Sequence, residues 1–232
     1  MEGACQLKKL ERLIALFLVT LLLTSCGLLD RLGFDTYDYM SESVTVTHEP
    51  SDETAVMLEE LLMILVTDSP ILPTFENMSE AISYYRDAVL EYLLSSDYAK
   101  YSGNSTLIER ASRKYPEYQI TQVIPELEFE SAMYRYFGGD VMITHRDGGK
   151  FRYLPDVEAY IPMLSFLESD YHVDVTSLSE TEKTYRVRFR VISDTCENGE
   201  ATDTSEEYFA LVIKREDGSL YIKKLLLGSD VR

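Results

Sequence analysis

Residues 171–178 read YHVDVTSL, and residues 184–192 read TYRVRFRVI. Apolar and polar side chains alternate through most of both stretches, and a period of two residues is typical of a β-strand that buries one face. Only a short polar segment separates the two stretches, so they predict an antiparallel hairpin. This hairpin would present an apolar face to the core and a polar face to the solvent.

The alternation also predicts which residues face each other across the hairpin. A slip by one residue would mix the apolar and polar faces, so a register that keeps the faces apart is favoured. That register joins residues whose numbers sum to 362, with the apolar pairs Tyr171–Val191, Val173–Phe189 and Val175–Val187 and the polar pairs His172–Arg190, Asp174–Arg188 and Thr176–Arg186.

Two more hairpins are predicted on either side of this one. Each has a short polar link with glycine between two apolar runs, which is a hairpin signal. The first joins residues 141–145 to 150–154 through Arg-Asp-Gly-Gly, and the last joins residues 208–215 to 220–227 through Glu-Asp-Gly-Ser. The acidic segment 194–207 lies before the last hairpin, and we expect it to form a mobile loop.

Helices are predicted in the part of the chain before the hairpins, because apolar residues recur there at intervals of three and four positions. Ser51 and Ser79 are suitable N-caps, prolines follow the first helix, and Gly138-Gly139 would end the last one. The predicted helices are residues 51–66, 79–96, 106–114 and 125–137, with a strand expected at 118–124.

Helices followed by an antiparallel meander predict an α+β fold, with the helices packed on one face of a curved sheet of about six strands. The order of elements over residues 51–227 resembles the nuclear-transport-factor-2-like or cystatin-like group. This resemblance implies helices that pack into a curved sheet, and no functional residue follows from it.

The N-terminus reads as a signal peptide. Lys8, Lys9 and Arg12 precede the apolar run LIALFLVTLLL at residues 13–23. An 11-residue helix is roughly 16 Å long, which is too short for a bilayer core of about 30 Å. Positive charge before a short apolar run and small residues after it are typical of a cleaved leader.

Leu23-Thr24-Ser25-Cys26 resembles the lipobox of bacterial lipoproteins. The resemblance implies that the Cys26 thiol receives a diacylglyceryl group, that a signal peptidase cuts after Ser25, and that Cys26 becomes the mature N-terminus. Several acyl chains, at about 0.8 kcal/mol per buried methylene, hold a protein firmly on a membrane. An outer-face or periplasmic-side location follows from the same resemblance, and both alternatives stay open.

The chain then divides into three parts. Residues 1–25 form the signal peptide, residues 26–50 the lipidated N-terminus and a flexible tether, and residues 51–232 one α+β domain. The tether is acidic and we expect most of it to be disordered, although Val44–Thr47 could add a short edge strand.

Charge and cysteine content narrow the classes of partner. Removing residues 1–25 takes three cations from 22 and two acids from 40, which leaves a net charge of −19. Such a surface repels phosphate backbones and anionic lipid heads, so we expect no nucleic acid partner and attachment to the membrane through the acyl chains on Cys26. Cys196 would be the one cysteine left for the folded domain, so no internal disulfide is expected.

One candidate binding strip stands out on the polar face of the second hairpin. Arg186, Arg188 and Arg190 form a cationic row with His172 beside it, and they could bind an anion. Alternatively, the arginines pair with nearby acids on a solvated face, where each exposed pair contributes about 0–1 kcal/mol.

No catalytic set, cofactor motif or metal-ligand spacing is found among the three histidines and three cysteines. We therefore expect a non-catalytic binding module of the cell envelope, with a peptide, a glycan or another envelope protein as its partner. The alternative is a small-molecule enzyme with a pocket between the helices and the sheet, in which His172, Asp174 and tyrosine hydroxyls would take part.

Overall fold

The computed structural model describes residues 38–66, 69–96, 98–102, 105–139, 142–164, 171–197 and 200–231. Of residues 98–99, 194–197 and 200–205 it describes the backbone alone. The expected signal peptide, Cys26 and the first part of the expected tether lie outside these residues, as does the side chain of Cys196.

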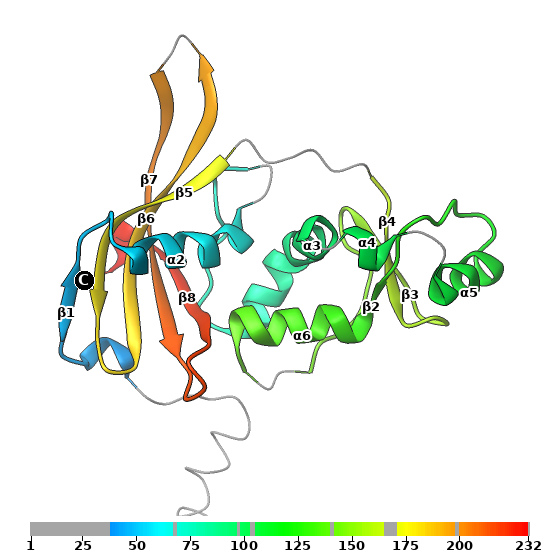
Figure 1. The fold of residues 1–232 in the computed structure, drawn as a ribbon, viewed down its shortest axis with the longest axis horizontal. Helices are drawn as coiled ribbons and strands as arrows, with labels where there is room; N and C mark the ends of the chain where they lie inside the picture. Colours follow the sequence, from blue (N-terminus) through cyan, green and yellow to red (C-terminus); the bar gives the residue numbers. More distant parts are fainter. Residues whose placement is uncertain are drawn as a thin grey trace, which may run out of the picture.

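The larger sheet has five antiparallel strands in the order β1-β5-β6-β7-β8 (Figure 1). Its strands are β1 (Val46–His48), β5 (Tyr171–Glu180), β6 (Thr184–Glu197), β7 (Glu200–Lys214) and β8 (Leu220–Leu227). The predicted second and third hairpins are therefore present as β5–β6 and β7–β8.

Helices occupy most of the first half of the described chain, close to the predicted positions. Ser105 caps one of them, because its hydroxyl accepts a hydrogen bond from the Ile108 amide. The helices are η1 (Tyr39–Ser41), α2 (Glu53–Leu62), η2 (Met63–Leu65), α3 (Met78–Ser96), α4 (Tyr98–Tyr101), α5 (Thr106–Lys114), α6 (Glu126–Phe137) and η3 (Gly228–Asp230). The α+β class predicted from the sequence is confirmed.

A second, smaller sheet replaces the predicted first hairpin. It has the order β2-β4-β3, formed by β2 (Ile124–Pro125), β4 (Ala159–Pro162) and β3 (Phe151–Leu154). The predicted strand at 141–145 is wrong for the described residues 142–145, which form no strand, and the strand expected at 118–124 is reduced to β2. The Thr144 carbonyl and the amides of Gly149 and Lys150 bond to side chains of α3. The hairpin turn falls after Leu154, between β3 and β4.

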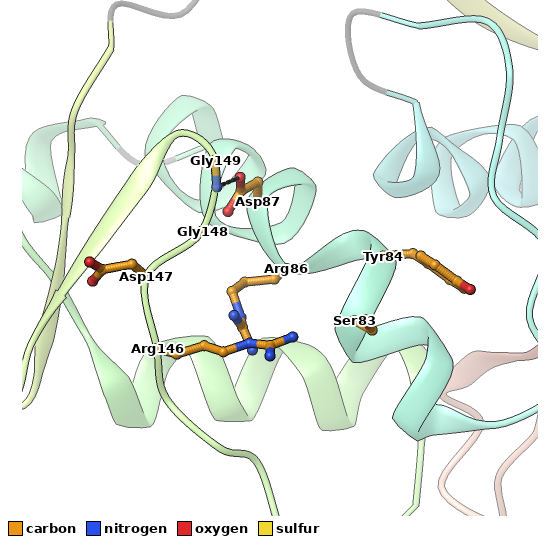
Figure 2. Close-up of a pocket in the computed structure, with 8 residues that line it drawn as sticks. All are labelled: Ser83, Tyr84, Arg86, Asp87, Arg146, Asp147, Gly148 and Gly149. Carbon is orange, nitrogen blue, oxygen red and sulfur yellow. Dashed lines mark hydrogen bonds between the residues drawn. The ribbon is translucent and has the colours of Figure 1, made fainter.

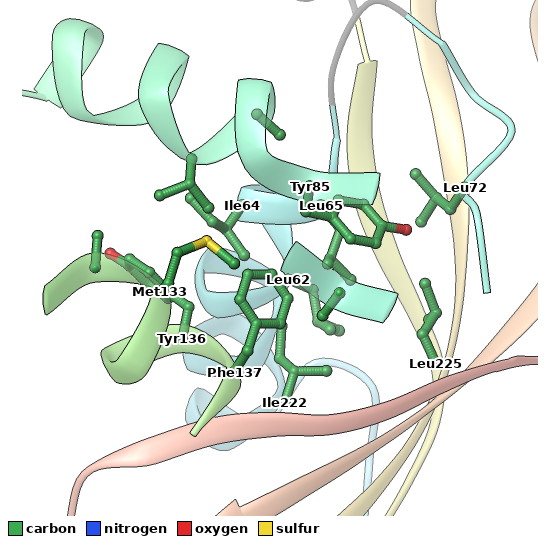
Figure 3. Packing of buried hydrophobic residues seen from close by; sticks show 14 of the residues in the cluster. Leu62, Ile64, Leu65, Leu72, Tyr85, Met133, Tyr136, Phe137, Ile222 and Leu225 are labelled. Atoms are coloured by element: carbon green, nitrogen blue, oxygen red, sulfur yellow. The ribbon is translucent and has the colours of Figure 1, made fainter. Parts of the chain in front are cut away.

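The main core lies between one face of the larger sheet and the helices α2, α3 and α6. Figure 1 shows α3 and α6 between the two sheets. Figure 3 shows side chains of these helices in the core beside β8: Phe137 lies next to Ile222, and Tyr85 points toward Leu72. A separate small cluster packs α5 against the smaller sheet, with Ile108, Ala111 and Ile161 among its members.

The register of the β5–β6 hairpin differs from the prediction. Paired numbers sum to 365 next to the turn and to 364 beyond a bulge between Val175 and Ser177. Compared with the predicted sum of 362, the register is shifted by two residues beyond the bulge and by three beside the turn. A shift by two keeps every side chain on its predicted face, and the one extra residue in the bulge absorbs the odd shift, so both predicted faces are retained. The turn itself decides the register: the amide of Thr181 donates to the carbonyl of Thr184 at 2.9 Å, which centres the hairpin on Glu182-Lys183.

Residues 194–197 and 200–207, expected to lie in a loop, belong to strands. β6 and β7 continue past the rest of the sheet as a two-stranded ribbon, with Cys196 paired to Ala201 (Figure 1). The sequence signal for this ribbon is Asn198-Gly199, the residue pair most typical of a two-residue hairpin turn. The expectation of a mobile loop gave too much weight to the acidic composition.

The segment before Ser51 also belongs to the fold. β1 pairs with β5 at the edge of the larger sheet, with Thr47 opposite Ser179, as the sequence Val44–Thr47 suggested. η1 lies on the sheet face opposite the main core, where Tyr39 packs against Phe209, Leu211 and Ile213. The ordered part of the chain therefore begins no later than Asp38, ahead of the expected boundary at Ser51.

Candidate functional site

The three arginines of the predicted binding strip lie on the outer face of β6, but two of them contact segments near the two ends of the described part of the chain. The Nη2 atom of Arg186 donates to the carbonyl oxygens of Tyr39, Met40 and Glu42 at 3.0, 2.9 and 2.7 Å. Arg188 bonds to Glu207 at 2.8 Å and contacts the Gly228 carbonyl at 3.5 Å. Arg188 thus pairs with an acid, as the alternative expected, whereas Arg186 binds backbone carbonyls.

His172 and Arg190, the other members of the strip, are not opposite each other. His172 is exposed and faces Ile192, whereas Asp174 takes the predicted place of His172 opposite Arg190. Arg190 also faces Glu207 on the other neighbouring strand. The structure therefore surrounds Arg190 with carboxylates and leaves His172 at the far end of the strip.

A cleft of about 330 Å³ lies elsewhere, between α3 and the segment that precedes β3. Four residues come from α3, and four consecutive residues come from the facing segment (Figure 2). The lining residues are Ser83, Tyr84, Arg86, Asp87, Arg146, Asp147, Gly148 and Gly149.

Asp87 holds the facing segment against α3. Its Oδ2 atom accepts hydrogen bonds from the amides of Gly149 and Lys150 at 2.7 and 2.9 Å. A Cβ atom at Gly148 would lie 2.0 Å from Oδ1 of Asp87, so only glycine allows this approach. The Gly148-Gly149 pair, which the sequence suggested as a hairpin turn, instead lets the backbone reach the helix.

Arg86 is the buried charge of the cleft. The residue is 7 % exposed, and its Nη2 atom donates to the Thr144 carbonyl at 3.2 Å. Its Nε atom is buried without a hydrogen-bond partner. Burial lowers the pKa of Arg86 first of all, and the positive charge of Arg146 lowers it further, against the opposing effects of Tyr160 and Asp87.

Arg146 approaches Arg86 from the other wall of the cleft. Figure 2 shows both guanidinium groups pointing into the same part of the cleft. Arg146 is exposed, and no ion pair joins it to a carboxylate in the described part of the chain. The cleft therefore combines one buried and one accessible guanidinium group.

A histidine lies directly behind this cleft, at the position before Arg146. The ring nitrogens of His145 lie 3.0 Å from the Tyr160 hydroxyl and 3.1 Å from Oε1 of Glu130. Burial raises the pKa of Tyr160 to about 12, so its hydroxyl stays protonated near neutral pH and can donate to His145. The ring of His145 also stacks on Tyr153, with centroids 5.1 Å apart.

A second, smaller cavity of about 180 Å³ lies at the outer edge of the smaller sheet. Residues 118–122 form one side and residues 161–163 the other. Its lining contains no carboxylate, histidine, lysine or arginine. The cleft beside Arg86 is therefore the better candidate for recognising a charged ligand.

Sequence reasoning missed this cleft, although one signal was present. Arg86 falls four residues after Ile82 and three before Val89, within the apolar stripe of its helix. A charged residue inside an apolar stripe is a reason to look for a buried partner or a ligand. The approach of Arg146 is a contact across 60 residues of chain, and no local pattern reveals it.

Within the described ranges, no three His, Cys, Asp or Glu side chains are grouped closely enough to hold a metal ion. None of the helices in those same ranges combines the length and apolar composition needed to cross a bilayer. Comparison with models of protein families, with curated proteins and with solved structures finds no match for this chain.

Proposed function

We propose that this chain is a lipid-anchored, extracytoplasmic binding module of the cell envelope, attached to the membrane by acyl chains on Cys26. One observation carries the proposal: Leu23-Thr24-Ser25-Cys26 directly follows a short apolar run with three cations before it. The folded domain then works on the outer face of the cell membrane, or on the periplasmic side in a cell with two membranes.

Three features of the molecule support a binding role. The net charge of −19 expected for the mature chain keeps the domain away from nucleic acid and anionic lipid heads. η1 and β1 attach the N-terminal segment to the larger sheet, so the anchor would lead directly into a folded body. The cleft beside Arg86 supplies a concave surface with charged groups.

The test is metabolic labelling of the full chain in a bacterial host with an alkyne analogue of palmitate. The wild-type chain should take up label and lose residues 1–25, and Cys26→Ser should abolish both processes. Cys5→Ser and Cys196→Ser are matched controls that remove a thiol elsewhere and should leave labelling unchanged. Label that persists in Cys26→Ser would refute the lipid anchor.

Location is tested separately, by adding protease to intact cells and to cells whose outer layer has been opened. A domain on the outer face is digested in intact cells, and a domain on the periplasmic side is digested only after opening. A domain that survives both treatments until the cells are lysed would contradict an extracytoplasmic location.

The second candidate is a small-molecule enzyme, and the His145 cluster is the observation that favours it. His145 is held between Tyr160 and Glu130, directly before the cleft residue Arg146. The residues first expected in that role, His172 and Asp174, do not line either of the two cavities described above. Consumption of a component of a small-molecule mixture, followed by NMR and lost in His145→Gln, would favour the enzyme over the binding module.

A further inference from the structure

The two arginines of the cleft lack the carboxylate partners that an acidic chain could readily provide. The chain has 40 acidic residues against 22 Lys and Arg. Even so, no ion pair is found for Arg86 or Arg146 in the parts of the chain that the structure describes, and the one hydrogen bond of the Arg86 side chain goes to a backbone carbonyl. The lack of an ion-pair partner for these two arginines is therefore a property of this site, because the chain as a whole has more acidic than basic residues.

Each of the two acids that line the cleft accepts hydrogen bonds from backbone amides. Asp87 accepts two backbone amides through Oδ2, whereas its Oδ1 atom is buried beside Gly148 without a hydrogen-bond partner. Asp147 accepts the Tyr153 amide through Oδ1 at 2.9 Å, and its Oδ2 atom lies 3.6 Å from Nε of Arg152. Both carboxylates hold the facing segment in place, and the negative charge of Asp87 partly offsets the positive charge of Arg86. Neither carboxylate forms an ion pair with Arg86 or Arg146 among the residues that the structure describes.

A buried charge without a counter-ion is unfavourable, and a native protein usually supplies a partner for it. Here the buried guanidinium faces a second positive charge, and an anion bound between the two arginines would offset their repulsion. The planar fork of arginine matches the oxygen geometry of carboxylates and phosphates. A cleft of about 330 Å³ lies near the lower end of the volumes typical of small-molecule sites.

We propose that the cleft between α3 and residues 146–149 binds the oxyanion group of a small molecule, with Arg86 and Arg146 as the two ligand-binding residues. The oxyanion belongs to a phosphate or to a carboxylate, which present the same charged oxygens. This proposal deepens the proposed function by naming the class of ligand. It rests on the proposed function only because it treats the chain as a binding module.

The arrangement assigns different roles to the two residues. Arg86 is fixed by burial and by the Thr144 carbonyl, so it forms a preorganised wall of the site. Arg146 is exposed and closes on the anion from the opposite wall. Removing Arg146 should therefore weaken binding without disturbing the fold, which makes it the better residue to test.

The experiment is a titration of the full chain, purified in mild detergent, with inorganic phosphate in one arm and with succinate in the other, at constant ionic strength maintained by chloride. Isothermal titration calorimetry measures binding to the wild-type chain, to Arg146→Ala and to Arg113→Ala. Arg113 is the matched control, because it is an exposed arginine at the end of α5, away from the cleft. The arm that binds more tightly identifies the class of oxyanion.

We expect at least one anion to bind the wild-type chain and Arg113→Ala equally, and to bind Arg146→Ala at least about tenfold more weakly, since a hydrogen bond to a charged group contributes about 1.5–3 kcal/mol. Arg86→Met should also bind at least about tenfold more weakly if it folds. The proposal is overturned if neither anion binds more tightly than chloride, or if Arg146→Ala and Arg113→Ala behave alike. Its failure is separable from that of the lipid anchor, because palmitate labelling of Cys26 is measured independently of anion binding.

Discussion

Glu180 joins the N-terminal edge strand to the rest of the larger sheet: its Oε2 atom lies 2.8 Å from Nε2 of His48. The other carboxylate oxygen, Oε1, accepts a hydrogen bond from Lys214 on β7. The hydrogen bond from Lys214 is the largest cause that lowers the pKa of Glu180, and His48 lowers it further, against the effect of burial. One carboxylate thus connects β1, β5 and β7.

Glu180→Gln should lower the free energy of unfolding at pH 7 by about 2 kcal/mol, because hydrogen bonds to a charged group are lost. A carboxylate with a lowered pKa in the folded state stabilises fully above its ordinary pKa, and this contribution disappears as the pH falls through the lowered value. Urea unfolding of the wild type and the variant at pH 7 and at pH 3 should give curves that converge in acid. Glu182→Gln, in the exposed turn nearby, is the control and should leave stability unchanged at both pH values.

Arg186→Ala should release the N-terminal segment from the sheet. The side chain bonds to three carbonyls between Tyr39 and Glu42, so its loss should speed amide hydrogen exchange in residues 38–48. Arg188→Ala is the matched variant, since Arg188 contacts Gly228 and should instead loosen residues 228–231. Equal exchange in both segments for both variants would contradict these separate roles.

Gly138→Ala should destabilise the protein far more than Gly218→Ala. Both glycines have positive φ, a backbone conformation that destabilises the folded state by about 1 kcal/mol or more when a residue other than glycine adopts it. A Cβ atom at Gly138 would also lie 2.5 Å from the ring of Tyr221, whereas nothing lies within 4 Å at Gly218. Thermal unfolding of the two variants measures the difference, and similar melting temperatures would show that the Tyr221 ring moves aside without cost.

Phe137→Ala should cost about 3–5 kcal/mol of unfolding free energy, as expected for a large aromatic in a core. Its ring is 2 % exposed and packs between Phe75 and Tyr85, with centroids 5.6 and 5.8 Å away. Leu127→Ala is the control on the same helix, because Leu127 is 70 % exposed and should change stability by less than about 0.5 kcal/mol. Urea unfolding of both variants tests whether this aromatic group holds α3 and α6 together.

Several features were predictable from the sequence because neighbouring residues decide them. The helix at 106–114 follows from the Ser105 cap and the apolar period, and the last hairpin follows from Glu-Asp-Gly-Ser between two apolar runs. The two faces of β5 and β6 follow from alternation alone. The expected leader and the expected lipidation of Cys26 are also inferred from consecutive residues, and they stay predictions from the sequence.

Tertiary structure decided the features that depend on contacts between distant residues. The register of β5 against β6 required the bulge after Val175, and the cleft required Asp87 to reach the amides of Gly149 and Lys150. Periodicity and capping energies act over a few residues, so they determine where helices and strands form. The approach of Arg146 to Arg86 depends on how α3 packs beside a segment 60 residues later in the chain. This packing forms only when the core assembles.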